Sequence, residues 1–314
     1  MTCRCCAKEF TPKSLRHRLL CADSREPVSV TSLFGKARAN VAITSPPYAA
    51  QREYDATSGF MPVPAGEYVA WYRAVADSVA AVLAPNGSYF LNIKEHADDG
   101  ERSLYVKDLV LAHKRQWGWL FVDEFCWRNT RNGVPGGWPN RFKNAWEPVF
   151  HFAKASSIKF NPDAVSALSD DVFEYSPDNP KSESGSGLLG SGKRSNQHKG
   201  LARPSNVIEV AAESGQGSHS APFPRALVEF FLKAFSDAGD IVFDSFMGSG
   251  STMAAAHVLG RIGYGIEISA GYCDVTIRRM MNIGAGPVVL EATGQTFEEV
   301  AVERGVRAPA EAVA

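Results

Sequence analysis

Ile241-Val-Phe-Asp-Ser-Phe-Met-Gly-Ser-Gly250 joins a short apolar run to a turn that contains two glycines. The apolar run is typical of a buried strand, and residues 253–259 are typical of the helix that would follow it. Glycines at such a turn let a ligand approach the backbone and the helix N-terminus closely. Glu267 ends the next predicted strand 23 residues after Asp244, a spacing at which an acid commonly accepts hydrogen bonds from ribose hydroxyls. The stretch therefore predicts a site for an adenosine-containing cofactor, with a plain tight turn as the alternative.

Strands and helices are expected to alternate along much of the chain. Apolar runs predict further strands at 41–43, 88–93, 121–127, 146–152 and 261–267. Apolar spacing near 3.6 residues predicts helices at 66–83, 108–116, 225–235 and 272–281. This alternation predicts an α/β fold with a mostly parallel sheet and helices on both faces.

The composition is that of an ordinary globular protein, with 314 residues, 45% hydrophobic residues and a net charge of −1. It excludes a uniformly basic surface but allows a local basic cleft. No apolar run reaches the roughly 18–20 residues of a membrane span, and residues 1–20 lack the apolar region of a secretory signal. The cysteines are too unevenly spaced for a secreted disulfide framework. We therefore expect a cytoplasmic protein with reduced thiols and no membrane partner.

Two consecutive prolines mark the end of another predicted strand, in Thr44-Ser-Pro-Pro-Tyr48. Because proline cannot continue a central strand, the chain leaves the sheet at Ser45, at the edge where ligand sites of open α/β sheets collect. Ser45 offers a hydroxyl, Pro46 a rigidly held carbonyl and Tyr48 a flat ring. Together they could hold a planar heterocycle by its exocyclic amino group. A proline-rich turn with a buried tyrosine is the alternative.

These motifs resemble the β group of the amino-methylating DNA methyltransferases. The resemblance is carried, in this order, by Thr44-Ser-Pro-Pro-Tyr48 with Gln51-Arg-Glu-Tyr54, by His219-Ser-Ala-Pro-Phe-Pro224, and by the stretches 239–252 and 259–267. It runs from about residue 17 to about residue 282, nearly the whole chain. It implies a seven-stranded, mostly parallel methyltransferase sheet with helices on both faces, plus a smaller irregular target-recognition insertion.

The resemblance also implies roles for individual residues. The cofactor would be S-adenosyl-L-methionine, bound by Asp244, Phe246, Gly248, Gly250, Glu267, Ala221, Pro222 and Phe223. The catalytic residues would be Ser45, Pro46, Pro47 and Tyr48. Ser245 stands where the family usually has proline, and Trp146-Glu147 where it often has His-Glu. We expect the first departure to tune cofactor affinity and the second to weaken only a minor motif.

The chemistry favours methylation of nitrogen over carbon. Methylation at C5 of cytosine requires a thiolate that attacks the ring. In the carbon-methylating family this cysteine follows a proline, and no cysteine of this chain does. Hydrogen bonds from an exocyclic amino group to Ser45 and Pro46 would favour a pyramidal nitrogen and direct in-line transfer to a flipped base. Family members with serine at this position mostly methylate cytosine N4, and those with aspartate mostly methylate adenine N6. The resemblance therefore implies cytosine N4 in double-stranded DNA, with adenine N6 as the alternative.

Two stretches of the chain are basic although its total charge is near zero. Residues 114–159 hold eight Lys or Arg against three acids, and residues 181–203 hold five against one. Interleaved tryptophans at 117, 119, 127 and 138 favour stacking and phosphate contact, with a core role as the alternative. The DNA-binding residues we expect are Arg52, Arg128, Arg131, Arg141, Lys193 and Arg194.

The expected organisation has four parts. Residues 1–152 would form the catalytic-loop half of the methyltransferase domain, 153–218 the target-recognition region, 219–284 the cofactor-binding half and 285–314 a tail. The composition shift to Ser, Gly, Asn, Pro and Lys between 176 and 217 supports the second part. A cognate restriction endonuclease and a second copy of the chain are further candidate partners.

Three alternatives remain open from the sequence. The substrate could be RNA or a protein amide, or the chain could be a catalytically dead DNA-binding module, although Ser45 and Glu267 are intact. The spacing Cys3-x2-Cys6 with His17-x3-Cys21 fits a zinc site. Against zinc, the stretch from His17 to Ser24 resembles the strand that opens the methyltransferase domain, so no metal is expected.

Overall fold

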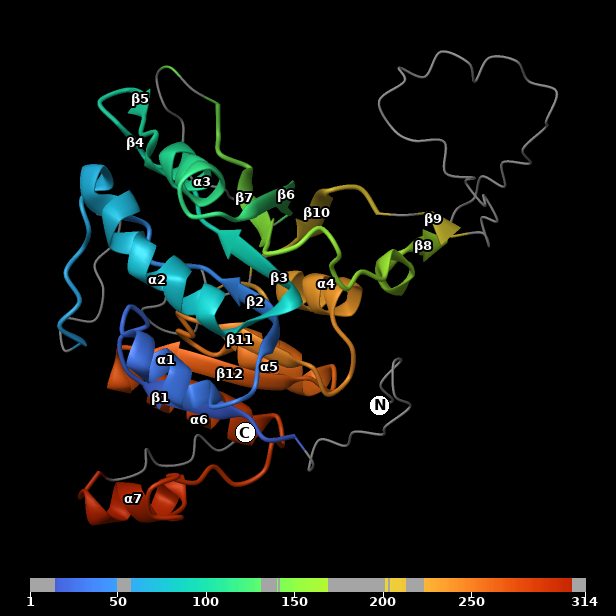
Figure 1. Cartoon of the computed structure of the whole chain (residues 1–314). Helices are drawn as coiled ribbons and strands as arrows, with labels where there is room; N and C mark the ends of the chain where they lie inside the picture. Colours follow the sequence, from blue (N-terminus) through green and yellow to red (C-terminus); the bar gives the residue numbers. More distant parts are fainter. Residues whose placement is uncertain are drawn as a thin grey trace.

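Eight strands form one sheet in the computed structural model, which describes residues 15–49, 58–130, 140, 142–168, 201–202, 204–212 and 223–306 (Figure 1). In spatial order the strands are β1 (Arg18–Cys21), β12 (Ile262–Glu267), β11 (Ile241–Asp244), β2 (Ala39–Thr44), β3 (Leu83–Asn92), β7 (Trp146–Ala153), β6 (Leu120–Asn129) and β10 (Val207–Val210). Neighbouring strands run parallel except at β7, which is antiparallel to both β3 and β6.

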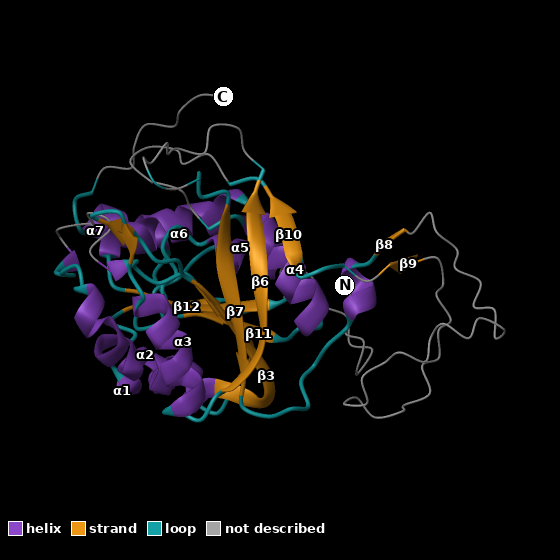
Figure 2. Ribbon diagram, turned by 90° about the horizontal axis from the view of Figure 1, so that it is seen from above, coloured by secondary structure: helices purple, strands orange, loops and turns teal. Residues whose placement is uncertain are grey.

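Helices cover both faces of the sheet (Figure 2). One layer holds α1 (Pro27–Phe34), α2 (Tyr68–Val82) and α3 (Tyr105–Arg115), and the other holds α4 (Arg225–Phe235), α5 (Ser251–Val258) and α6 (Ala270–Asn282). The smaller elements are α7 (Phe297–Glu303), the short helices η4 (Ala65–Glu67) and η5 (Pro162–Val165), and the paired short strands β4 (Ala97–Asp98) with β5 (Glu101–Arg102) and β8 (Ala167–Leu168) with β9 (Leu201–Ala202).

Alternating side chains of the central strands supply the two cores between these layers. Successive residues of a strand point to opposite faces, so a strand buried on both sides is apolar along its whole length. On β3, Tyr89 and Leu91 pack with α2 and α3, whereas Phe90 packs with α4. The second core is rich in rings: Phe90 lies 4.4 Å from Phe231, measured between ring centroids.

The predicted fold class is confirmed, with one strand more than the seven expected. The additional strand, β10, pairs with β6 at the edge of the sheet and comes from within residues 153–218. All the predicted strands and helices are present, and α4 has the bounds that the apolar spacing predicted. Helices α1 and α7 were not predicted.

Two of the tryptophans expected to face DNA lie in the cores instead. Trp119 and Trp127 are 3% and 5% exposed, because Trp119, just before β6, packs in the first core and Trp127, on β6, packs in the second. Trp117 packs partly against the first core and holds Arg73 over its ring. Trp138 lies outside the described residues.

Two histidines link the start of β1 to the end of α5. His17 Nδ1 accepts a hydrogen bond of 2.9 Å from the Gly263 N–H, so its Nε2 carries the proton and donates to His257 Nδ1 at 3.0 Å. A zinc site would need His17 to give up one of these bonds; Cys3 and Cys6 lie outside the described residues. In the part of the chain that the structure describes, no helix is long and apolar enough to cross a membrane.

Candidate active site

The Ser-Pro-Pro-Tyr loop and the glycine loop meet at one edge of the sheet. Parallel strands β2 and β11 are neighbours, so their carboxyl ends lie together. Thr44 is the last residue of β2 and Asp244 the last residue of β11. The Thr44 Oγ1 donates a hydrogen bond of 2.7 Å to Asp244 Oδ1. Ser45 and Ser245 both follow these ends directly. The two motifs that the sequence places 200 residues apart are thereby held side by side.

Asp244 fixes the start of the glycine loop. Its carboxylate accepts hydrogen bonds from Thr44 Oγ1, from Thr252 Oγ1 at 2.6 Å and from the Phe246 N–H at 3.0 Å. The side chain is 3% exposed, and burial raises its pKa while these hydrogen bonds lower it. With three donors on two oxygens, Asp244 ties β2, β11 and α5 together, and its first task is to shape the loop.

Glu267, at the end of β12, holds the other side of the glycine loop. Its Oε2 accepts a hydrogen bond of 2.7 Å from the Gly248 N–H and its Oε1 one of 2.9 Å from the Ser269 N–H. Burial raises the pKa of the carboxyl, and these backbone hydrogen bonds oppose that shift. A carboxylate has about four acceptor positions, so Glu267 keeps capacity for the hydroxyls of a ribose.

The glycines of the loop fit a close ligand. Gly248 has a φ of +53°, and a Cβ built there would come no closer to another group than 3.9 Å, at the Phe246 carbonyl. That side of the loop is therefore open. Gly250 has a φ of +81° and its Cβ would lie 2.9 Å from the Thr276 side chain, so only glycine fits. Together with Glu267, these residues suit a ligand such as S-adenosyl-L-methionine.

The Ser-Pro-Pro-Tyr loop is pinned from behind. Tyr68 of α2 donates a hydrogen bond of 2.6 Å from its hydroxyl to the Pro47 carbonyl. Pro46, Tyr48 and Ala49 are buried, and Ser45 is half-buried. Ala49 has a φ of +34°, a left-handed conformation that costs on the order of 1 kcal/mol for a residue with a side chain. The surrounding contacts hold the loop in this conformation.

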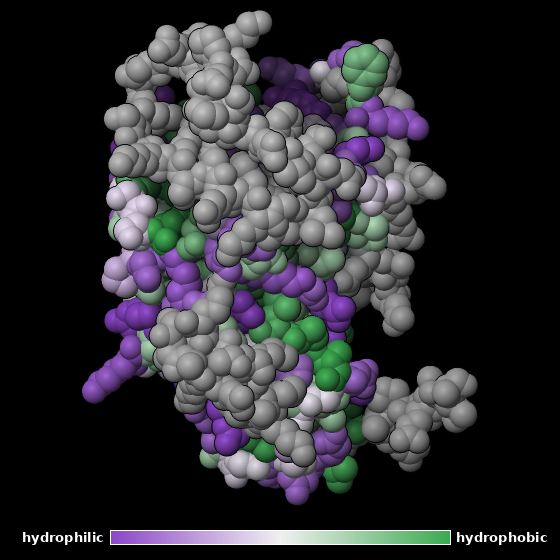
Figure 3. Space-filling model, turned by 90° about the vertical axis from the view of Figure 1, so that its right-hand side faces the viewer, coloured by the Kyte–Doolittle hydropathy of each residue, from purple (hydrophilic) through white to green (hydrophobic). Residues whose placement is uncertain are grey.

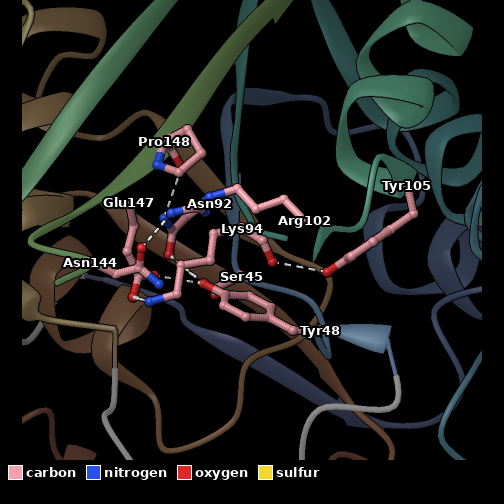
Figure 4. A network of polar contacts seen from close by, with 9 residues as sticks. All are labelled: Ser45, Tyr48, Asn92, Lys94, Arg102, Tyr105, Asn144, Glu147 and Pro148. Carbon is pink, nitrogen blue, oxygen red and sulfur yellow. Dashed lines mark hydrogen bonds and ion pairs between the residues drawn. The ribbon is translucent and has the colours of Figure 1, made fainter. Parts of the chain in front are cut away.

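Polar side chains from β3 and β7 and from the residues just after β3 converge on Ser45 and Tyr48 (Figure 4). The Tyr48 hydroxyl lies 3.1 Å from Asn92 Oδ1 and 3.0 Å from Glu147 Oε2. Ser45 Oγ lies 3.3 Å from both Asn92 Oδ1 and the Tyr48 hydroxyl. Lys94 forms an ion pair with Glu147 on its other carboxylate oxygen. The result is a connected network behind the predicted base-binding residues.

Sequence reasoning did not assign a role to Asn92, Lys94 or Glu147. Asn92 and Lys94 lie at the end of β3 and just beyond it, and Glu147 lies near the start of β7. Because β7 is antiparallel to β3, its amino end lies at the carboxyl edge of the other strands. Two signals were available: the polar Asn92 near the end of the apolar run 88–93, and Glu147, which stands where the family often has the glutamate of His-Glu.

Of the remaining predicted cofactor residues, the structure describes Phe246 and Phe223. Phe246 is partly buried, with its ring centroid 6.1 Å from that of Trp71 on α2. Phe223 precedes α4 and packs partly against the second core. Ala221 and Pro222 lie outside the described residues.

Of the predicted DNA-binding residues, the structure describes Arg128 alone. It lies near the end of β6, exposed, and pairs with Glu209 of β10 at 2.5 Å. Arg52, Arg131, Arg141, Lys193 and Arg194 lie outside the described residues. Two lysines of the first basic stretch have partners within the fold: Lys159 pairs with Asp237 and Asp240, and Lys154 donates to the carbonyls of Ala80 and Leu83.

A cavity of about 260 Å³ lies on the α4 side of the sheet, away from this network. Its walls are mostly apolar, and they include Phe125, Phe160, Phe230 and Phe235 with His151 and Asp123. Apolar side chains also gather on the described surface in the view of Figure 3. The His151 ring is stacked on Phe90, and its Nε2 lies 3.0 Å from Ser88 Oγ, so it serves the core. The candidate chemistry therefore lies at the Ser45 edge.

The sequence profile of the N6_N4_Mtase family, described as DNA methylase, matches residues 39–278. This match spans both loops and all the strands between them. The chain belongs to the N6/N4 DNA methylase family. The order of its motifs along the chain, with the Ser-Pro-Pro-Tyr loop first and the glycine loop last, agrees with the predicted β group.

Named relatives of this methylase are type II methyltransferases. M.PvuII of Proteus hauseri is 26% identical over 269 residues, which cover 77% of this chain and 78% of the relative. M.ScaI of Streptomyces caespitosus is 25% identical over 263 residues, which cover 77% and 74%. M1.MboII of Moraxella bovis is 28% identical over 199 residues, which cover 56% of this chain and 71% of the relative.

Solved structures share the fold of this methylase. The PvuII DNA methyltransferase, named as cytosine-N4-specific, superposes with a TM-score of 0.62 and 22% identity over 85% of this chain and 88% of that one. A DNA modification methylase from Thermus thermophilus, solved with S-adenosyl-L-methionine, superposes with a TM-score of 0.56 and 19% identity over 90% and 96%. The methyltransferase fold is thereby established for this chain, which is a DNA methyltransferase of the N4/N6 type.

Proposed function

We propose that this methylase transfers a methyl group from S-adenosyl-L-methionine to the exocyclic N4 of cytosine in double-stranded DNA. The observation that carries the proposal is the hydrogen bond between Thr44 and Asp244, which joins the Ser-Pro-Pro-Tyr loop to the glycine loop. A group held by Ser45 would therefore lie close to a cofactor held by Glu267. Direct transfer between two bound molecules needs this proximity above all.

S-adenosyl-L-methionine supplies a methyl group on a positively charged sulfur, which makes it a strong methyl donor. Glu267 would accept hydrogen bonds from its ribose, and Gly248 and Gly250 would let it approach the backbone. Asp244 holds the loop in shape, and Phe246 borders it. Ala221, Pro222 and Phe223 are assigned to the methionine end on the family resemblance.

Ser45 and Pro46 would hold the exocyclic amino group of the flipped base. Their oxygens can accept one hydrogen bond from each N–H, which favours a pyramidal nitrogen with an available lone pair. The Tyr48 ring supplies a flat surface for the base, and Pro47 keeps the loop rigid through Tyr68. The fixed acceptors provide the catalysis, since preorganised hydrogen bonds in a site shielded from water need no reorganisation during the reaction.

Cytosine N4 is favoured over adenine N6 because the first residue of the loop is Ser45, and family members with serine there are mostly cytosine enzymes. The PvuII methyltransferase is also named cytosine-N4-specific. Both bases present the same exocyclic amino group, so the geometry of Ser45 and Pro46 accommodates either. Adenine N6 is the alternative product that the experiment below distinguishes.

The DNA contacts and the organisation of the chain are part of the proposal. Arg128 and the residues Arg52, Arg131, Arg141, Lys193 and Arg194 would contact the phosphates, and residues 153–218 would recognise the target sequence. Residues 1–152 and 219–284 would form the two halves of the catalytic domain, with 285–314 as a tail. A cognate restriction endonuclease and a homodimer are the protein partners we propose to test.

The test is methylation-sensitive sequencing of DNA from cells that express the chain or its Ser45→Ala variant. We expect N4-methylcytosine at one short recognition sequence with the wild-type chain and its loss in the variant. Radiolabelled transfer from S-adenosyl-L-methionine to purified DNA, RNA and protein gives the substrate class. N6-methyladenine would shift the proposal to the alternative base, and label in RNA or protein alone would overturn it.

A further inference from the structure

The network behind Ser45 contains few hydrogens and several acceptors, so the hydrogens can be assigned. Asn92 is 1% exposed, and its Nδ2 donates a hydrogen bond of 3.0 Å to the Pro148 carbonyl. This bond fixes the amide, with Oδ1 turned toward Ser45 and Tyr48. Asn92 therefore acts only as an acceptor on the side that faces the loop.

Tyr48 has one hydroxyl hydrogen. Among the described residues, Asn92 Oδ1 at 3.1 Å and Glu147 Oε2 at 3.0 Å are nearer acceptors than Ser45 Oγ at 3.3 Å. A carboxylate attracts a hydroxyl hydrogen more strongly than a neutral amide oxygen does. Lys94 forms an ion pair with the other oxygen of Glu147, which keeps this carboxylate in place. The Tyr48 hydrogen therefore points to Glu147, and the Tyr48 oxygen presents a lone pair on its other side.

Ser45 then faces two acceptors at once, Asn92 Oδ1 and the Tyr48 oxygen, each 3.3 Å from its Oγ. Its single hydrogen is drawn toward them, away from the space in front of the loop. We propose that the Glu147–Lys94 ion pair, acting through Tyr48 and Asn92, fixes Ser45 as a hydrogen-bond acceptor toward the base. Glu147 and Lys94 are then positioning residues that determine which bases the site can hold.

The consequence is a choice between kinds of base. A Ser45 that only accepts can bind the N–H of an exocyclic amino group, but it cannot donate to an exocyclic carbonyl. The site would accept cytosine or adenine and reject thymine or uracil, which have exocyclic carbonyls and no exocyclic amino group. This inference rests on the proposed function, because it supposes that a base lies against Ser45.

The first experiment reads the network in the protein alone, without DNA or cofactor. Tyrosine labelled with ¹³C at Cζ is incorporated, and the Tyr48 signal is assigned with Tyr48→Phe. We expect Glu147→Gln and Lys94→Met to move this signal, because both weaken the bond from Tyr48 to a charged carboxylate. Glu229→Gln is the matched control, since its side chain is 18% exposed against 19% for Glu147 and also forms ion pairs with basic partners. An unmoved signal in both network variants would overturn the assignment.

The second experiment is a double-mutant cycle between Ser45→Ala and Glu147→Gln. It measures kcat on an unmethylated duplex that contains the sequence the enzyme methylates. We expect Glu147→Gln to lower kcat about 10- to 100-fold, with cofactor affinity unchanged. Ser45→Ala should lower kcat about 10²- to 10³-fold in the wild-type background but less than about 10-fold beside Glu147→Gln. This non-additivity would show that the two residues are coupled and that both changes remove the same oriented acceptor.

Equal losses from Ser45→Ala in both backgrounds would overturn the inference while leaving the methyltransferase proposal intact. A wild-type chain that transfers no methyl group to DNA would overturn the proposed function instead, and the spectroscopic experiment would still decide the network. Lys94→Met repeats the cycle without altering any group that touches Tyr48 directly. It guards against a loss of kcat that reflects only the altered Glu147 side chain.

Discussion

At the scale of single residues, Ser45 and Glu267 have separable tasks. Ser45 directly follows β2 and Glu267 is the last residue of β12, and these two strands lie on either side of β11. Ser45 belongs to the network with Tyr48 and Asn92, whereas Glu267 bonds to the backbone of the glycine loop. No hydrogen bond links the two side chains among the residues that the structure describes. Their substitutions should therefore affect different steps.

We expect Ser45→Ala to lower turnover about 10²- to 10³-fold and to leave S-adenosyl-L-methionine affinity nearly unchanged. Glu267→Ala should do the reverse and weaken cofactor binding about 10- to 100-fold, since hydrogen bonds to a charged group are worth about 1.5–3 kcal/mol. Calorimetry gives cofactor affinity, and fluorescence anisotropy gives DNA affinity as the control. Full methylation by Ser45→Ala would show that its loop is not the catalytic one.

Gly250 offers a second test at this scale. Its φ of +81° and the 2.9 Å approach of a built Cβ to Thr276 both exclude a side chain. Gly118 has a similar φ of +76° but no atom within 4 Å of a built Cβ. We expect Gly118→Ala to cost about 1–2 kcal/mol of unfolding free energy from the left-handed backbone alone. Gly250→Ala should cost about 1–3 kcal/mol more from overpacking, measured by urea denaturation. Equal costs would mean that Thr276 moves aside.

At the scale of elements, α4 carries much of the second core. Phe231 is fully buried and contacts the rings of Phe90 and Phe125, with centroids 4.4 Å and 5.1 Å away. Its neighbour Phe230 is half-buried and borders the cavity on that side. Both positions are phenylalanines of the same helix, but they differ in burial.

We expect Phe231→Ala to lower the unfolding free energy by about 3–5 kcal/mol, because it leaves a cavity among rings that cannot close over it. Phe230→Ala should cost clearly less, since part of its ring already faces solvent. Urea denaturation of both variants checks this. If the costs were the same, burial on this face would not be what stabilises the helix.

Helices and strands could be predicted from the sequence where a local pattern of apolar residues marks them. They could not be predicted where the element forms only because it pairs with a distant strand. The 3.6-residue spacing of apolar side chains predicted α4, and the apolar run 241–244 predicted β11. Strand β10 has four residues inside a Ser- and Gly-rich stretch, and it exists because it pairs with β6. Helix α1 is eight residues long and buries only Val30, Leu33 and Phe34. So short a pattern does not stand out.

The same distinction applies to the candidate site. Ser45, Tyr48 and Glu267 each belong to a short motif, so the sequence pointed to them. Asn92 and Glu147 are isolated polar residues on two strands, and they meet Tyr48 only because β7 packs against β3 in the opposite direction. Tertiary pairing of this kind leaves no mark in a single sequence. For the tryptophans, Trp119 and Trp127 show that aromatic residues beside basic ones can still belong to the core.

At the scale of the whole molecule, buried histidines should make the fold sensitive to acid. His113 has no exposed surface, and burial among apolar groups lowers its pKa to about 4. Burial also lowers the pKa of His17 to about 4, with nearby His257 as the second cause, and that of His151 to about 3. A histidine of the unfolded chain binds a proton near pH 6.5, so protons favour the unfolded state. This stability is present above pH 6.5 and is lost progressively as the pH falls to about 4.

The His113→Phe variant isolates one such group. Its ring stacks on Phe152 at 4.5 Å, so phenylalanine should fit, although the bond from Nδ1 to the Leu109 carbonyl is lost. We expect the stability of the wild type relative to the variant to fall by about 3 kcal/mol between pH 7 and pH 4, since each pKa unit corresponds to about 1.4 kcal/mol. Urea denaturation across this range measures the difference. A pH-independent difference would mean that His113 titrates normally in the folded protein.

The one reversed strand of the eight-stranded sheet, β7, gives the edge that holds Ser45 a tolerance for change. Arg128 of β6 pairs with Trp146 of β7, so the connection between these strands leaves and returns at neighbouring points of the sheet. Doubling the length of such a connection costs only about 0.6 kcal/mol of closure entropy. Glu147 stands inside the paired strand, where the ladder fixes its position whatever the connection does. The connection between β6 and β7 can therefore lengthen close to Glu147, which contacts Tyr48, without rebuilding the strands that carry Asp244 and Glu267.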